Sequence, residues 1–201
     1  MPPRQPLSFD PIAEAGRNWR AAGWDAAAPG MALVTSIMRA HQILLARVDA
    51  ALTPFGLTFA RFEVLMLLDF SRSGRLPLGR IGQRLQVHPA SVTNAIDRLE
   101  EAGLVERIPH PTDGRTTLGA ITRVGRRLVR KAAAALNADV FGSVGLADDN
   151  AKVVVDALAC LRRHAGDFEP LLNGPLLNEP LLNDPLLNGP LLNGPSEEAR
   201  S

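Results

Sequence analysis

Several residue types that often carry function are scarce in this chain. Tyrosine is absent, aromatic residues are only 4% of the sequence, and Cys160 is the single cysteine. The core must therefore be built mainly from Leu, Val, Ile and Ala. One cysteine excludes an intrachain disulfide and gives no framework for a metal site.

Long apolar segments are lacking as well. No run approaches the ~18 apolar residues that span a bilayer. The first residues, MPPRQPLSFDP, contain no apolar segment like that of a signal peptide. We therefore expect a cytoplasmic protein with no membrane partner.

The signatures of catalysis and of metal binding are also missing from the sequence. There is no phosphate loop, no nucleophile elbow and no pair of histidines on one helix. The four histidines do not have the spacing of metal ligands; they are His41, His88, His110 and His164. The sequence predicts neither an enzyme nor a protein with a metal or cofactor.

Charge, by contrast, is distributed very unevenly along the 201 residues. The formal net charge is 0 over residues 1–71, +7 over residues 72–131 and −6 over residues 132–201. A basic block of this kind is the electrostatic footprint expected of a protein that binds a polyanion. The alternative is an ordinary solvated basic face.

Apolar periodicity and turn residues divide the chain into segments. We expect a short helix at 11–27, an interruption at Pro29-Gly30, and a long helix over 31–53. Thr58 should cap the next helix, which runs to about Ser71. Further helices are predicted over 78–85, 89–102, 122–141 and 148–164, the last capped by Asp148. Strands are predicted over 104–108 and 115–121, joined by a turn at 109–114.

This order of elements describes a mostly α (α+β) fold, a winged helix-turn-helix with a two-stranded wing. The helix over 89–102 carries Val92, Ala95, Ile96 and Leu99 on one face, and Gly103 stands at its end as a capping glycine. A recognition helix needs small or polar residues near its N-terminus, so that it can approach base edges. The residues that meet this need are Ala90, Ser91, Thr93, Asn94 and, one turn on, Arg98. Asn94 can pair with adenine, and Arg98 can reach guanine or a phosphate. Taken alone, these residues would be read as a solvated helix face.

The turn HPTDGRTT places one arginine on the predicted wing. Arg115 can enter a narrow minor groove, where the negative potential is greatest. Asp113, two residues earlier, can hold the guanidinium of Arg115 in place. The alternative is a surface hairpin with an exposed ion pair worth roughly 0–1 kcal/mol. Asp97 is not expected to touch DNA unless it accepts from cytosine or holds an arginine.

With these segments in place, the chain resembles the MarR family (multiple antibiotic resistance regulators) over about residues 31–165. The resemblance rests on Leu57-Thr58 with Phe62 and Val64-Leu65, on Leu78, Ile81-Gly82, Leu85 and Val87, on Pro89-Ala90-Ser91-Val92-Thr93, on Leu99 to Arg107, on Asp113 with Arg115, and on Ile121-Thr122 with Gly125.

The resemblance implies a homodimeric regulator that binds double-stranded DNA at a pseudo-palindromic operator, with repression as the expected effect. The terminal helices over 31–53 and 122–165 would form the dimer, and the winged helix-turn-helix over 57–121 would bind DNA. The recognition helix would enter the major groove and Arg115 the minor groove. The family's wing usually reads Asp-Arg-Arg, whereas Gly114 stands here in place of the first arginine. This departure implies a more flexible wing tip with one cation fewer, and Gly119-Ala120 should weaken the return strand.

Members of such a family are often released from DNA by small aromatic ligands or by cysteine oxidation. The predicted apolar surroundings of Cys160 argue against oxidation. Arg39, His41 and Arg61 are polar groups that a ligand could contact, but the ligand site itself is not predicted. The alternative function is a winged-helix module that binds proteins and has no specific DNA binding.

The two ends of the chain differ from this domain. Residues 1–30 are expected to be an extension, in part a short helix. Residues 166–201 contain five pentapeptides of the type PLLNG, in which a proline at every fifth position blocks a helix. We expect a disordered tail, with docking of its leucines on the domain as the alternative.

Overall fold

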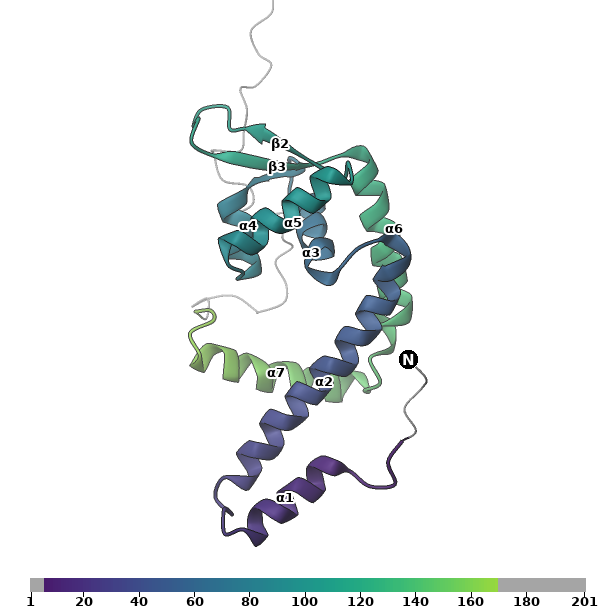
Figure 1. Ribbon diagram of the computed structural model, residues 1–201, viewed down its shortest axis with the longest axis vertical. Helices are drawn as coiled ribbons and strands as arrows, with labels where there is room; N and C mark the ends of the chain where they lie inside the picture. Colours follow the sequence, from purple (N-terminus) through teal and green to yellow (C-terminus); the bar gives the residue numbers. More distant parts are fainter. Residues whose placement is uncertain (1–5, 170–201) are drawn as a thin grey trace, which may run out of the picture. The chain divides into compact units, whose positions relative to one another are not determined.

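The computed structural model describes residues 6–169, which divide into two compact units with a boundary between Ala50 and Ala51. The predicted repeat tail and the first five residues lie outside the described residues. Figure 1 shows the helices and strands of the two units.

The first unit contains helix α1 (Pro11–Ala21) and most of helix α2 (Ala28–Leu52). Asp10 caps α1, since its carboxylate accepts from the backbone N–H of Ile12 at 2.9 Å. The expected interruption at Pro29-Gly30 is wrong, because α2 already begins at Ala28. A proline is tolerated there because the N–H groups of a first helical turn have no partner within the helix.

Helix α2 exposes much of its apolar surface within the described residues. The large apolar side chains that are exposed are Leu33, Val34, Met38, Ile43, Leu44 and Leu45. The predicted helical period is therefore present, but the stripe it forms is open in the single chain. Trp19 and Trp24 meet edge to face near the turn between α1 and α2, with their ring centroids 5.1 Å apart.

The second unit has more elements. Its helices are α3 (Phe59–Phe70), α4 (Leu78–Leu85), α5 (Pro89–Glu101), α6 (Arg123–Asp139) and α7 (Asp148–His164), with short 3-10 turns at Thr53–Phe55 and Phe141–Ser143. Its strands are β1 (Arg75–Pro77), β2 (Val105–Pro109) and β3 (Thr117–Ile121). Thr58 caps α3 as predicted, and Gly103 follows α5 in the left-handed conformation, with φ of 67°.

The sheet contains the predicted two-stranded wing, formed by β2 and β3, and one strand more. It has three antiparallel strands in the order β1-β3-β2, and β3 begins at Thr117 rather than at residue 115. The sequence did not indicate β1, because a three-residue strand that ends in proline has no alternation to detect. It forms because Leu76, which is fully buried, lies opposite Gly119 of β3.

Helices α3, α4 and α5 pack on one another and against the sheet, and α6 packs on α3. The fully buried aliphatic side chains at the centre of this unit include Leu65, Leu68, Ile81, Ile96, Leu99, Leu118, Val129 and Leu136. A buried carboxylate joins α3 to α6: Asp69, with a side chain 5% exposed, accepts from Arg126 at 2.5 Å and from Arg130 at 3.0 Å. Since Asp69 is almost fully buried, these two arginines compensate the charge of its carboxylate.

Helix α7 differs from the prediction at its start. Ala147 occupies the capping position and makes no side-chain hydrogen bond, while Asp148 and Asp149 lie in the first turn, where carboxylates interact favourably with the helix dipole. No residue of α7 is buried, and Val153, Val154 and Leu161 are 66%, 44% and 48% exposed. Its apolar stripe is open, like that of α2.

No single helix within residues 6–169 is long and apolar enough to cross a membrane. Taken together, the bent pair Ala28–Phe55 and Phe59–Phe70 has the length and the apolar composition to do so.

Candidate nucleic-acid interface

Helix α5 begins at a tight turn after α4. Gln86 ends α4 with a left-handed φ of 53°, and the Val87 N–H donates to the Gly82 carbonyl at 3.1 Å. His88 then caps α5, because its Nδ1 accepts from the Ala90 N–H at 3.2 Å. Pro89 occupies the first turn, as predicted. The start of α5 is therefore fixed by local hydrogen bonds.

The two faces of α5 are divided as the sequence predicts. Val92, Ile96 and Leu99 are buried, whereas the exposed positions are Ala90, Ser91, Thr93, Asn94, Asp97 and Arg98. The Thr93 hydroxyl donates to the Pro89 carbonyl at 3.1 Å, which leaves its oxygen able to accept. Asn94 makes no side-chain hydrogen bond to any residue between 6 and 169. Its amide is therefore available to a ligand outside the chain.

Arg98 lies in an exposed ion pair with Glu101, at 3.0 Å. Their side chains are 63% and 65% exposed, so the pair is worth roughly 0–1 kcal/mol and does not prevent Arg98 from reaching another anion.

An ion-pair cluster that the sequence did not predict joins α5 to the sheet. Arg107 on β2 donates through its guanidinium to both Asp97 and Glu100, and its backbone N–H donates to Glu100 at 3.1 Å. Burial alone would lower the pKa of Arg107, but the hydrogen bonds and charges of the two carboxylates outweigh burial and raise it. Asp97 therefore holds an arginine, which is one of the two roles left open for it.

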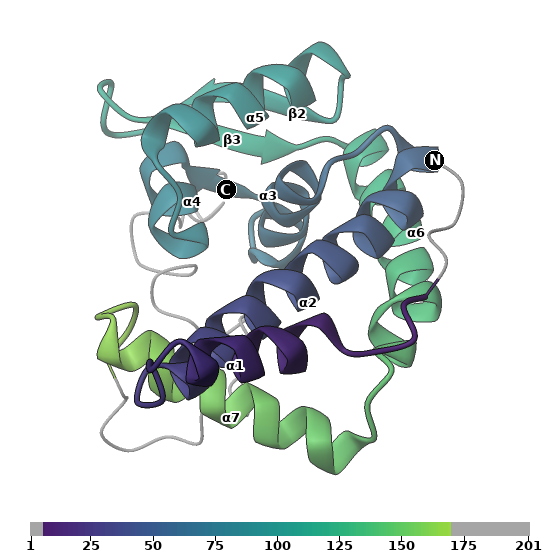
Figure 2. The ribbon, with the colours of Figure 1, turned by 60° about the horizontal axis from the view of Figure 1, so that its bottom comes forward.

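The loop between β2 and β3 projects beyond the strands and carries Arg115 (Figure 2). The expectation that Asp113 holds the Arg115 guanidinium is wrong. The Asp113 carboxylate instead accepts from the Arg115 backbone N–H at 3.0 Å and from the Thr116 hydroxyl at 2.6 Å. These two hydrogen bonds, the Thr116 hydroxyl first, and the nearby His110 lower the pKa of Asp113. The Arg115 side chain is exposed and has no partner among the described residues.

Two glycines of this hairpin differ in their surroundings. Gly114 lies at the loop tip, where an added Cβ would meet nothing within 4 Å. Gly119 is different: a Cβ there would lie 3.2 Å from Ile96 Cδ1 and 3.7 Å from Ile81 Cδ1. Gly119 was expected to weaken the hairpin, but the structure shows that it admits α4 and α5 close to the sheet.

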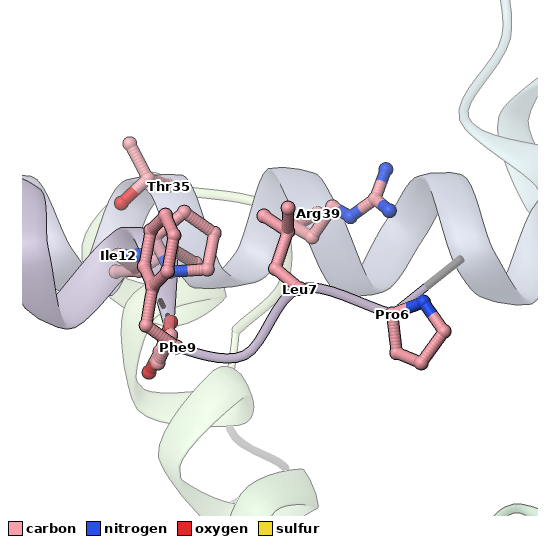
Figure 3. A pocket seen from close by; sticks show the side chains of 8 residues that line it. Pro6, Leu7, Phe9, Ile12, Thr35 and Arg39 are labelled. Carbon is pink, nitrogen blue, oxygen red and sulfur yellow. Dashed lines mark hydrogen bonds between the residues drawn. The ribbon is translucent and has the colours of Figure 1, made fainter. Parts of the chain in front are cut away.

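Of the polar groups considered for a small ligand, Arg39 and His41 belong to the first unit and Arg61 belongs to the second. In the first unit, the segment before α1 lies along α2 and leaves a hollow of about 830 Å³ lined by Pro6, Leu7, Phe9, Asp10, Pro11, Ile12, Thr35 and Arg39 (Figure 3). Arg39 thus lines a hollow, whereas His41 and Arg61 do not line it. Asp10, which caps α1, also lines this hollow, and the Arg39 guanidinium donates to the Gln42 side-chain oxygen at 3.3 Å.

The expected surroundings of Cys160 need correction. Its thiol is exposed rather than enclosed by apolar groups, and Arg163 Nη2 lies 3.1 Å from Sγ. Over residues 6–169, no group of three or more His, Cys, Asp or Glu side chains could hold a metal ion.

Comparison with known proteins agrees with this arrangement. The sequence model of the MarR family matches residues 57–117. The HTH-type transcriptional repressor Rv2887 of Mycobacterium tuberculosis is 32% identical over 102 residues, which is 51% of this chain and 72% of the relative.

Solved structures show the same resemblance. Sco5413, a MarR family transcriptional regulator from Streptomyces coelicolor, is 51% identical with a TM-score of 0.64, and the match covers 71% of this chain and 99% of that one. CouR from Rhodococcus jostii RHA1, bound to p-coumaroyl-CoA, is 29% identical with a TM-score of 0.58, over 70% of this chain and 95% of that one. CouR bound to a 23-mer DNA duplex is 25% identical with a TM-score of 0.59, over 64% and 90%.

The polar face of α5, the loop with Arg115 and the sheet behind them therefore occur in a chain whose sequence and fold both match one group of regulators. The protein belongs to the MarR family of DNA-binding transcriptional regulators.

Proposed function

We propose that the protein is a homodimeric repressor that reads a pseudo-palindromic operator with two copies of α5. The observation that carries this proposal is the exposed polar start of α5 beside a loop whose arginine has no partner in the described chain. Both lie in the basic block of residues 72–131, which has a net charge of +7. A positively charged surface of this kind favours the phosphate backbone.

The proposed contacts follow from the chemistry of each exposed group. Ala90, Ser91 and Thr93 let the helix approach the major groove, and Asn94 pairs with an adenine edge. Arg98 contacts guanine or a phosphate. The wing loop, ordered by Asp113, inserts Arg115 into the adjacent minor groove, where a guanidinium is favoured.

The proposed dimer rests on apolar surface. Helices α2 and α7 each expose a row of large aliphatic side chains, and contiguous exposed apolar surface of this kind marks interaction sites. A second copy related by a two-fold axis supplies an identical apolar surface. Two recognition helices related in this way would read half-sites about 10 bp apart.

Relatives support the repressor role and the binding of a ligand with an aromatic group; release by a small aromatic ligand is our proposal. Rv2887 is named a repressor, and CouR is a repressor with structures bound to DNA and to p-coumaroyl-CoA. In this chain, the hollow along α2 offers apolar walls and the cation of Arg39, which suits a small aromatic carboxylate. Benzoate and p-coumarate are suitable probes, with benzyl alcohol as the uncharged control. Release of bound DNA by the acids but not by the alcohol would support a site for aromatic carboxylates. If the Arg39→Gln variant no longer distinguishes the acids from the alcohol, that site is the hollow along α2.

Selection of bound duplexes from a random DNA pool tests the central proposal. We expect an inverted repeat, and the affinity for it should fall steeply as salt rises, because each phosphate contact releases counterions. In Arg115→Ala the affinity should fall and the salt slope should decrease by about one unit. No enrichment of any sequence, together with salt-insensitive binding to proteins, would favour the alternative of a protein-interaction module.

A further inference from the structure

One histidine is buried inside the exposed wing loop. The residues from Pro111 to Arg115 are all exposed, yet His110, at the start of this loop, is only 8% exposed. A polar ring in such a position must have hydrogen-bond partners, because burial without them is costly. The proposed function gives this ring no role.

His110 Nδ1 faces two backbone groups and one hydroxyl of its own loop, the Thr112 hydroxyl, which lies 3.4 Å away. His110 Nδ1 lies 3.3 Å from the Thr112 N–H and 3.2 Å from the Asp113 N–H, and both of these groups are donors. The ring nitrogen must therefore accept, which requires an unprotonated Nδ1. The His110 N–H in turn donates to the Thr116 carbonyl at 3.1 Å and closes the loop.

A second layer of hydrogen bonds connects this ring to Arg115. Once His110 has oriented the Asp113 backbone, the Asp113 carboxylate accepts from the Arg115 N–H at 3.0 Å and from the Thr116 hydroxyl at 2.6 Å. The Thr116 N–H also donates to the Asp113 carbonyl at 3.0 Å. His110 and Asp113 thus act in series on the backbone from which the Arg115 side chain extends.

The need for such support is clear from the loop itself. Gly114 precedes Arg115, and a Cβ added there would meet nothing within 4 Å. Glycine also loses more conformational freedom on ordering than other residues. Fixing each loop residue costs roughly 1–2 kcal/mol, and a loop that is ordered before it meets DNA does not incur this cost on binding.

We propose that His110 is a positioning residue for the wing: by accepting two backbone N–H groups, it holds the loop in the conformation that presents Arg115 to DNA. The inference rests on the proposed function, since it needs Arg115 to contact DNA. His110 itself lies too deep in the loop to be the contacting group.

A double-mutant cycle tests this inference. The affinity of the full chain is measured for the duplex selected by the wild-type protein, in four variants: wild type, His110→Ala, Arg115→Ala and the double variant. We expect His110→Ala to weaken binding about five- to tenfold in the wild-type background and less than twofold beside Arg115→Ala, because coupled residues are not additive. His110→Asn, which keeps an acceptor oxygen close to the position of Nδ1, should retain affinity within about twofold of wild type.

The outcomes separate this inference from the proposed function. If Arg115→Ala leaves the affinity unchanged, the proposed wing contact is wrong, and the role of His110 falls with it. If Arg115→Ala weakens binding but His110→Ala has no effect, or has the same effect in both backgrounds, the positioning role alone is wrong. A His110→Asn variant that is as weak as His110→Ala would also overturn it, since an acceptor would then not be what the loop needs.

Discussion

Gly125→Ala should destabilise the protein strongly, even though alanine favours helices. Gly125 lies in the first turn of α6, and a Cβ added there would be 2.1 Å from the Leu104 carbonyl oxygen, which belongs to the backbone. Real Cβ atoms essentially never come within 3.0 Å of such an atom, so α6 and the start of β2 must separate by about 1 Å.

The hydrogen bonds lost in that movement give the magnitude. The Thr122 N–H donates to the Leu104 carbonyl at 3.0 Å, and the Thr122 hydroxyl lies 2.9 Å from the Gly103 carbonyl and 3.2 Å from that of Leu104. A shift of about 1 Å breaks most of these contacts, each worth about 1 kcal/mol. The helix gains about 0.5–1 kcal/mol from alanine, so the net loss should be about 2 kcal/mol.

Urea unfolding followed by circular dichroism measures this loss. Gly79→Ala is the matched control, because Gly79 is also helical and a Cβ there meets nothing within 4 Å. The control should be as stable as wild type or more stable. A Gly125→Ala variant that unfolds at the same urea concentration as wild type would refute the reasoning. The Leu104 carbonyl would then move away from the new Cβ without lowering the free energy of unfolding.

Three further changes have definite expected outcomes. Gly114→Arg should raise operator affinity and make its dependence on salt steeper by about one unit. The loop tip has room for a side chain and gains a second cation beside Arg115. An unchanged salt dependence would mean that the wing does not contact the DNA. Asp69→Ala should lower the free energy of unfolding by about 1–2 kcal/mol, less than for a fully buried pair because its arginines are 36% and 65% exposed; thermal or urea unfolding as stable as wild type would contradict this. Val154→Asp combined with Leu161→Asp places two charges on one face of α7 and should weaken self-association at least tenfold if a second copy covers that face; sedimentation that shows the same dimer as wild type would exclude it.

Periodic features of the fold could be predicted from the sequence. The helix over 78–85 has the predicted bounds. Of the four residues that its period selects, α5 buries Val92, Ile96 and Leu99 and half-buries Ala95. Thr58 and Gly103 were correctly assigned to helix ends because capping depends on local chemistry. These predictions succeeded where neighbouring residues decide the structure.

Features that depend on distant residues could not be predicted. Strand β1 exists only because β3 pairs with it, and the cluster around Arg107 joins residues seven and ten positions away in the sequence. His110 was considered only as a metal ligand, because nothing in the sequence shows that its ring turns into its own loop. Asp113 was assigned to the correct loop but to the wrong partner, since a guanidinium and a backbone N–H are equally near in sequence.

The lack of a side chain at Gly119 affects which shape of DNA duplex the wing and α5 can bind together. The distance between the base of the wing and the axis of α5 is set by the contact of Ile96 with a bare backbone. A larger residue there would act as a wedge and tilt the recognition helix away from the wing. The two would then no longer fit adjacent grooves of an undistorted duplex, and the protein would come to prefer operators that bend easily at that step. Gly119 thus fixes the distance between the wing and α5, and through it the spacing of the grooves that the two can enter, without itself touching the DNA.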